Sequence, residues 1–301
     1  MNRFLCFGSL NLDDTYRVSH FVGAGETLAA SEVNTFCGGK GLNQSVALAR
    51  AGGKVYHAGC IGEDGALLKE ALLYAGVNTD FVCTLPGEKT GHAIIQNTAD
   101  GENCILLYGG ANRCIRKEFI DSVLAGFESG DTLVLQNEIN QIEYLMKAAK
   151  HKGMKIAFTP APMDESVRAY PLELADFILL NETEARELAS LPDSEVSHQN
   201  VLAQRLSEKY PEVGFVLTLG AAGCLYFKNR ERIFQGAFAV KAVDTTAAGD
   251  TFAGFFLQSV TAGSDIQSAL EIASKAAAIC VTRRGASPSI PTWDEVVGEH
   301  S

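Results

Sequence analysis

Short apolar runs alternate with helical segments from Asn112 onward, and this alternation restricts the fold more than any other feature. The runs Thr132–Gln136, Lys155–Phe158, Phe177–Leu180 and Phe215–Leu219 are apolar on both faces, as strands covered on both sides are. Helical patterns separate them, which is typical of β-α-β connections. The sequence therefore predicts an α/β fold with a doubly wound, mainly parallel sheet flanked by helices.

Polar side chains follow the ends of these strand-like segments. Asn11 and Asp13 come soon after the apolar run Arg3–Phe7, and Glu138 and Asn181 follow later strands. Open α/β sheets bind ligands just outside the carboxyl ends of their strands. We therefore expect these side chains to meet at one edge of the sheet.

Two stretches, 13–35 and 87–109, lack this alternation of strand-like and helical segments. Within the second, Thr90–Gln96 and Cys104–Tyr108 are rich in β-forming residues, and the turn residues Thr98–Glu102 between them indicate a hairpin. We expect the two stretches to form a small antiparallel sheet inserted into the α/β core. The core then comprises the remaining segments, 1–12, 36–86 and 110–301.

Charge and cysteine usage narrow the possible partners and the compartment. The formal net charge of −11 argues against nucleic acid or an anionic membrane as a partner. No signal peptide or membrane span is visible. The eight cysteines lack a Cys-x-x-Cys pair and the six histidines lack zinc spacing. We expect reduced thiols, and hence a cytoplasmic protein.

The stretch Asp244–Phe252, which follows an apolar run over Phe234–Val243 that we expect to be a strand, is suited to anion binding. Small residues at Ala247, Ala248 and Gly249 precede a helical run, so backbone N–H groups and the positive end of the helix dipole converge there. Asp250 lies in the first turn, where a carboxylate can take a proton from a hydroxyl. The alternative is a plain junction in which Asp250 only complements the helix dipole.

A second glycine-rich stretch, Gly38–Gln44, precedes a predicted helix over Ser45–Arg50. It is not a Walker P-loop, because Gly41 follows the Gly-Lys pair and the five-residue lead is absent. Its glycines allow close backbone approach to a ligand, and Asn43 is placed to bind a hydroxyl. A glycine-rich helix entry without a ligand is the alternative.

Both stretches resemble the signature motifs of the ribokinase-like (PfkB) carbohydrate kinases, and the similarity covers nearly the whole chain. The resemblance implies an ATP-dependent kinase that phosphorylates the primary hydroxyl of a pentose, with D-ribose the expected acceptor. Another sugar, such as 2-deoxyribose or a ketohexose, or a nucleoside remains the alternative. The small sheet would then be a lid over the sugar and the surface of a homodimer.

The resemblance also assigns roles to individual residues. Asp250 is implied as the catalytic base, with an anion hole at Ala247, Ala248 and Gly249. The residues implied in sugar binding are Asn11, Asp13, Gly39, Lys40, Gly41, Asn43 and Glu138. Those implied in nucleotide binding are Asn181, Thr218, Gly220 and Gly223.

Two kinds of cation are implied as well. Magnesium would accompany ATP, with Glu184 contacting it through water. A monovalent cation, most simply potassium, would lie between two loops and be held partly by backbone carbonyls. The residues implied around it are Asp244, Thr246, Cys280, Arg283, Gly285 and Ser289. A salt bridge from Asp244 to Arg283 or Arg284, with no ion, is the alternative.

The chain departs from the family pattern at Thr159, Leu180 and Leu42. None of these removes a group with an assigned role, although Leu42 lies in the sugar loop and bears on which sugar is used.

Several assigned residues also have simpler interpretations. Glu138 could cap the helix at Gln141–Ile142, Thr183 could cap the helix after Asn181, and Gly220 and Gly223 could be hairpin turn residues.

Two other classes of protein were weighed against a kinase. A dinucleotide-binding oxidoreductase is disfavoured, because no Gly-x-Gly-x-x-Gly follows the first strand. A sugar sensor without activity is disfavoured by the intact Asp250 motif.

Overall fold

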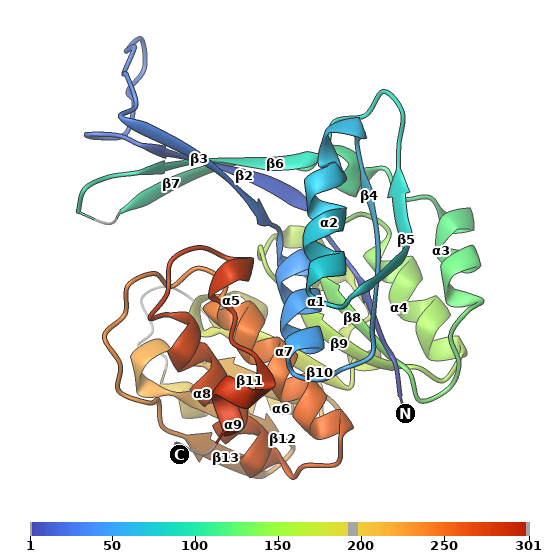
Figure 1. Ribbon diagram of the computed structural model, residues 1–301. Coiled ribbons are helices and arrows are strands. Elements are labelled where there is room, and N and C mark those ends of the chain that lie inside the picture. Colours follow the sequence, from blue (N-terminus) through green and yellow to red (C-terminus); the bar gives the residue numbers. More distant parts are fainter. Residues whose placement is uncertain (1, 101, 192–197, 299–301) are drawn as a thin grey trace.

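Nine strands form the central sheet of the computed structural model, which describes residues 2–100, 102–191 and 198–298 (Figure 1). The strand order is β13-β12-β11-β10-β9-β8-β1-β4-β5. Seven strands run parallel: β1 Phe4–Phe7, β4 Val55–Ile61, β5 Asn78–Thr84, β8 Thr132–Gln136, β9 Lys155–Thr159, β10 Phe177–Asn181 and β11 Gly214–Thr218. Two antiparallel strands complete one side: β12 Cys224–Lys228 and β13 Glu231–Gln235. The predicted mainly parallel sheet is confirmed.

Helices cover both faces of this sheet and enclose two apolar cores. One face carries α3 Lys117–Leu124, α4 Ile142–His151, α5 Glu182–Leu188 and α6 Gln199–Lys209. The other carries α1 Lys40–Arg50, α2 Ala66–Tyr74, α7 Ala248–Thr261, α8 Ile266–Cys280 and α9 Trp293–Val297. Strands covered on both faces have no polar side, which explains their continuous apolar sequences. In the described ranges, no helix has the length and apolar character needed to cross a bilayer.

A second sheet of four strands projects from the core (Figure 1). Its order is β3-β2-β6-β7, with bounds β2 Asn11–Arg17, β3 Glu32–Gly38, β6 Gly91–Asn97 and β7 Asn103–Tyr108. The pairs β2–β3 and β6–β7 are antiparallel, and β2 runs parallel to β6 where the two insertions meet. The small inserted sheet expected from the sequence is therefore present, and we call it the lid sheet.

Two local predictions are wrong. The apolar run Phe234–Val243 is not a strand, because β13 ends at Gln235 and residues 236–247 have no regular structure. Val240 and Val243 are exposed there. This apolar segment lies beyond the last strand of the sheet and pairs with no neighbouring strand in the described residues. Helix α1 begins at Lys40 rather than Ser45, because the glycine-rich segment itself enters the helix.

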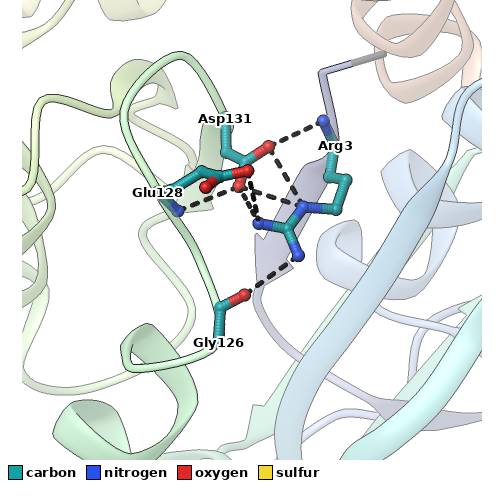
Figure 2. A network of polar contacts seen from close by, with 4 residues as sticks. All are labelled: Arg3, Gly126, Glu128 and Asp131. Carbon is teal, nitrogen blue, oxygen red and sulfur yellow. Dashed lines mark hydrogen bonds and ion pairs between the residues drawn. The ribbon is translucent and has the colours of Figure 1, made fainter.

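The amino ends of β1 and β8 are joined by a network around Arg3 (Figure 2). Its guanidinium donates to both carboxylate oxygens of Asp131, at 2.5 to 3.2 Å, and to the carbonyl of Gly126 at 3.0 Å. The backbone N–H groups of Arg3 and Glu128 also donate to Asp131. Burial opposes the charge of Asp131, but these donors outweigh it and hold its pKa below the usual range. The charged groups at this edge of the sheet therefore satisfy one another and hold the amino ends of β1 and β8 together.

Candidate active site

The glycine-rich segment places the start of α1 directly against the carboxyl end of β1. A Cβ atom at Gly41 would lie 2.4 Å from the backbone nitrogen of Ser9, so only glycine permits this approach. Gly39 precedes the helix with φ 89°, a conformation that glycine adopts without strain. The close contact brings the first turn of α1 to the edge where the strand-end side chains lie.

Glu138 joins the end of β8 to the start of α1. Its carboxylate accepts the backbone N–H of Lys40 at 2.9 Å and the hydroxyl of Ser9. It therefore satisfies a free donor at the amino end of α1. The alternative that Glu138 caps the helix at Gln141–Ile142 is wrong, because its carboxylate bonds Ser9 and Lys40 and α4 has no side-chain cap.

Asn11 begins the lid strand β2 and is buried. Its Oδ1 accepts a hydrogen bond from the Asn112 amide at 2.8 Å, while Asn112 also pairs with both backbone groups of Leu10. Beside it lies a cavity of about 130 Å³, lined by Asn11 and Leu107 from the lid sheet and by Asn112 and Glu138 from the core. The space between core and lid can therefore hold a small polar ligand.

Charged groups crowd together at the same place. Burial, followed by repulsion from Glu138 and Asp14, raises the pKa of Asp13 to about 7, although Lys40 opposes this. Burial alone would lower the pKa of Lys40, but the surrounding carboxylates, Asp250 first among them, raise it. The Lys40 side chain therefore remains a cation among carboxylates. Ionising the Asp13 carboxyl is unfavourable unless a hydrogen-bond donor or a cation pairs with it.

Asp250 lies in the first turn of α7 and is buried. The Asn43 amide donates to its Oδ2 at 3.1 Å, and the Gln44 amide donates to its Oδ1 at 3.0 Å. The Oδ1 of Asn43 is buried and has no hydrogen-bond partner within the described residues. The carboxylate is therefore held in place, and one of the two amides that hold it has an unpaired acceptor.

The backbone before Asp250 is held in an uncommon conformation. Ala247 precedes α7 with φ 60°, which costs a non-glycine residue on the order of 1–3 kcal/mol. No side chain caps the helix, although the N–H of Ala248 makes a long bond of 3.3 Å to the Thr245 carbonyl. Gly249 and Asp250 are the next residues of the first turn, where helix N–H groups lack intrahelical acceptors. The predicted anion hole therefore has suitable donors.

Asn181 and Glu184 form a capping box at the start of α5. Each side chain accepts the backbone N–H of the other at 2.9 Å. The alternative that Thr183 caps this helix is wrong. Burial raises the pKa of Glu184, and the charges of Lys40 and Asp250 also act on it, the first lowering the pKa and the second raising it. Within the described ranges, no group of three or more His, Cys, Asp or Glu side chains is arranged to hold a metal.

The remaining predicted nucleotide residues lie on the next strand of the sheet. Thr218 ends β11, while Gly220 and Gly223 lie in the connection to antiparallel β12. The hairpin-turn interpretation of the two glycines is therefore correct as a description of the backbone. In the part of the chain that the structure describes, no hydrogen bond joins this loop to the Asp250 cluster.

The two loops predicted around a monovalent cation do come together. Asp244 accepts the backbone N–H groups of Thr246 and Gly285, both at 2.9 Å, and these bonds oppose the effect of burial and lower its pKa. The thiol of Cys280 lies 3.7 Å from the Thr246 carbonyl and 3.1 Å from the hydroxyl of Ser289.

The predicted alternative for these loops, a salt bridge from Asp244, is not formed by Arg283. Arg283 pairs with Glu295 at 2.5 Å. Ser289 is buried and donates to the Ala286 carbonyl. The loops therefore offer carbonyl and hydroxyl oxygens beside a carboxylate, a donor set that fits a large monovalent cation.

Several site residues escaped the sequence analysis. Ser9, Asn112 and Gln136 are each buried and hydrogen-bond a predicted site residue or its neighbour. Gln44 was only part of a motif, and Thr159 only a departure from one, yet the Gln44 amide contacts both Thr159 and Asp250. Burial of a polar residue would have singled them out, but burial is not visible in one sequence.

Comparison with known proteins agrees with this geometry. A family model described as pfkB family carbohydrate kinase matches residues 1–293. The chain belongs to this family. The pfkB-family chain is therefore a phosphotransferase that uses an alcohol group as acceptor. All eight of its cysteines are free thiols.

Individual relatives cover nearly the whole of this pfkB kinase. The ribokinase of Haemophilus influenzae is 37% identical over 295 residues, which are 96% of this chain and 95% of the relative. The deoxyribokinase of Salmonella typhi is 32% identical over 276 residues, 90% of each chain. The structure of Arabidopsis thaliana ribokinase complexed with ribose and ATP has a TM-score of 0.87 at 30% identity, covering 99% of this chain and 98% of that one.

Proposed function

We propose that this kinase transfers the γ-phosphate of ATP to the primary hydroxyl of D-ribose and forms D-ribose 5-phosphate. The observation that carries the proposal is the unpaired, buried Oδ1 of Asn43 beside the fixed carboxylate of Asp250. A buried acceptor without a partner is costly, and a sugar hydroxyl placed there would satisfy it. The ribokinases among its relatives support ribose as that sugar.

The reaction requires little covalent chemistry from the protein. Asp250 takes the proton of the sugar hydroxyl as its oxygen attacks the γ-phosphorus, and the bond from that phosphorus to the bridging oxygen of ADP breaks. The N–H groups at Ala247, Ala248 and Gly249 stabilise the oxygens of the transferring group. Positioning and electrostatics supply most of the rate gain.

Sugar, nucleotide and magnesium would be divided among neighbouring elements. The sugar is held by the residues around the core–lid cavity and the start of α1: Asn11, Asp13, Gly39, Lys40, Gly41, Asn43 and Glu138. The nucleotide lies along the next strands, at Asn181, Thr218, Gly220 and Gly223. Glu184, coupled to Lys40 and Asp250, would hold magnesium through water. Magnesium, when bound, offsets the negative charge of the phosphates.

The lid sheet supports two further parts of the proposal. The lid region that we propose spans 13–35 and 87–109. Its residue Leu107 lines the cavity, and closure of the region over the sugar would exclude water that competes for ATP. Every residue of β7 is exposed, Leu106 by 68%. Soluble proteins seldom leave such an apolar edge strand uncovered, which supports a homodimer formed through the lid sheets. The free thiols support a cytoplasmic location.

A panel of acceptors tests the function. We expect kcat/KM for D-ribose to exceed that for 2-deoxyribose, ketohexoses and adenosine. A polar site penalises an analogue that leaves its groups unpaired, often by far more than tenfold. A preference for 2-deoxyribose would favour the alternative that the Salmonella typhi relative suggests. A kcat/KM for 2-deoxyribose, a hexose or adenosine that is comparable to that for D-ribose would reject the ribose assignment.

Light scattering on a sizing column tests the dimer. Leu106→Glu places a charge on the exposed edge strand and should give monomers. Leu73→Glu is a matched control, because Leu73 is similarly exposed on α2 and should leave the dimer intact. A parent chain that elutes as a monomer at micromolar concentration would contradict this part of the proposal.

A monovalent cation, most simply potassium, is the last part of the proposal. The residues that would surround it are Asp244, Thr246, Cys280, Arg283, Gly285 and Ser289, several through backbone carbonyls. Its charge would steady the loop that leads to Ala247. Initial rates at fixed ionic strength should be higher with potassium or caesium than with sodium or a bulky organic cation. Equal rates in all four would reject the site.

A further inference from the structure

Two consecutive side chains of α1 reach the carboxylate of Asp250. Asn43 donates to Oδ2 and Gln44 donates to Oδ1. Asn43 belongs to the proposed sugar site and has an unpaired oxygen. Gln44 is buried as well, and its amide donates to the other carboxylate oxygen and has no unpaired atom within the described residues. The two oxygens of Asp250 are therefore held by two different residues, of which only Asn43 has an acceptor left for a ligand.

The hydrogen-bonding groups of Gln44 are all used. Its Nε2 donates to Asp250 at 3.0 Å and to the hydroxyl of Thr159 at 3.3 Å. Its Oε1 accepts from the Nε2 of Gln136 at 2.7 Å. A primary amide has one acceptor oxygen and one donor nitrogen, so the bond from Gln136 fixes which end of Gln44 points to Asp250.

Gln136 is the last residue of β8, is completely buried, and continues the chain of hydrogen bonds to β1. Its Nε2 also approaches the sulfur of Cys6 at 3.6 Å. Turning the Gln136 amide over would set two acceptor oxygens face to face. Turning both amides would set an oxygen against the carboxylate of Asp250. Only one arrangement therefore presents donors along the whole chain.

This arrangement is kept at a cost. The Oε1 of Gln136 is buried and has no partner in the described part of the chain, which natural structures mostly avoid. Gly8 leaves space for it, because a Cβ there would lie 2.4 Å from that oxygen. A buried amide whose oxygen is unpaired, and whose nitrogen donates to the residue that holds the base, is more simply explained by a role at the site than by stability.

We propose that Gln44 and Gln136 form an amide relay that positions the base Asp250. Gln44 is the positioning residue that holds Oδ1 and favours the ionised carboxylate, and Gln136 holds Gln44. Oδ2, next to Asn43, is left to take the proton from the sugar hydroxyl. This inference rests on the proposed kinase function and adds two residues to it.

Three other titratable groups are electrostatically coupled to this carboxylate. They are Lys40 from α1, Glu184 from α5 and Cys6 from β1. The test therefore leaves these three unchanged and alters only uncharged side chains.

The test compares kcat against pH for the parent, Gln44→Met and Gln136→Met. Methionine is close to glutamine in length and cannot donate a hydrogen bond. Ser45→Ala is the matched control, because Ser45 is the next residue of α1, is equally buried, and bonds His57 at 2.8 Å rather than Asp250. Circular dichroism and thermal unfolding establish that each variant is folded, and KM for ATP and ribose is recorded for all four.

We expect Gln44→Met to lower kcat by about ten- to a hundredfold, the range for a lost hydrogen bond to a charged group. The acid limb of its pH profile should move up by about one pH unit, because the ionised carboxylate has lost a donor. Gln136→Met should move the limb in the same direction by less. KM for both substrates should stay within about threefold of the parent, because Gln44 and Gln136 are buried and belong to neither proposed substrate site.

An unmoved acid limb in Gln44→Met, or an equal displacement in Ser45→Ala, would overturn the relay. If Gln44→Met does not fold, Gln136→Met decides, since it does not touch Asp250 and its limb must still move. A parent without sugar kinase activity would contradict the proposed function itself. An active parent with unmoved variants would remove the relay alone.

Discussion

The two edges of the central sheet use charged groups in opposite ways. At the amino edge, Arg3 and Asp131 satisfy each other, and the pKa of Asp131 is held below its usual range. At the carboxyl edge, burial and nearby carboxylates raise the pKa of Asp13, and burial raises that of Glu184. Strands β1 and β8 begin at the amino edge, and Ser9 and Glu138 follow their carboxyl ends. Charged side chains that pair with one another within the chain stabilise the fold. Charged side chains without such a pair can instead bind a ligand.

The largest expected effect is on activity at the carboxyl edge. Asp250→Asn should lower the rate of phosphoryl transfer by about 10² to 10⁴, the usual loss for a positioned general base. ATP affinity should stay within a few-fold, because in this account Asp250 acts on the sugar hydroxyl and does not hold the nucleotide. Steady-state rates with calorimetric titration of ATP measure both. Turnover within tenfold of the parent would rule out the role of Asp250.

The next effect is on stability at the amino edge. Asp131→Asn should lower the free energy of unfolding by about 2–3 kcal/mol, because the Arg3 cation loses its buried partner. Its kcat should equal that of the parent. Glu128→Gln is the control: this carboxylate is 82% exposed and lies 3.7 Å from Arg3, so its loss should cost under about 0.5 kcal/mol. Urea denaturation followed by fluorescence compares the three chains, and equal costs would break the contrast between the edges.

Asp13→Asn should have the opposite effect to Asp131→Asn and raise the free energy of unfolding at high pH. Because the pKa of Asp13 is raised to about 7 in the folded chain, the folded state holds its proton more tightly than the unfolded one. Stability from this group is therefore present at low pH and is lost as pH rises through about 7. Asp13→Asn should be more stable than the parent by about 1–2 kcal/mol at pH 8 and equal to it near pH 4, while sugar use is lost. Thermal unfolding at both values of pH decides, and a variant less stable at pH 8 would contradict the account.

The smallest effect is expected at Asn181, which serves as both a cap and a proposed nucleotide residue. Asn181→Ala should destabilise the chain by about 1 kcal/mol through loss of the helix cap. Asn181→Asp keeps the cap acceptor, so stability should remain, while its added negative charge should raise KM for ATP. If the aspartate variant binds ATP as the parent does, Asn181 is a structural residue only.

Much of this contrast was open to prediction from sequence. Strands such as Thr132–Gln136 are apolar throughout, and the edge position of Asn11 and Glu138 follows from where those strands end. Spacing also indicates local partners, as for Asn181 and Glu184, which meet three residues apart. These predictions depend on short-range patterns that one sequence displays.

Other features could not be predicted. Gln44 and Asp250 are 206 residues apart, and no pattern in the sequence shows that α1 and α7 lie together. The run Phe234–Val243 has a strand-like composition, but whether it finds a partner at the sheet margin is decided by tertiary structure. Arg3 and Asp131 are likewise paired only once β1 and β8 are neighbours. What was missed is long-range pairing of buried polar groups.

The central claim is that the carboxyl edge delivers the primary hydroxyl of ribose to Asp250. Phosphorus NMR of the product made from ATP and ribose labelled with carbon-13 at C5 tests it most directly. The account predicts a phosphomonoester signal split by coupling to C5, formed by the parent and not detectably by Asp250→Asn over the same time. Absence of that coupling, or the same product at the same rate from Asp250→Asn, would contradict it.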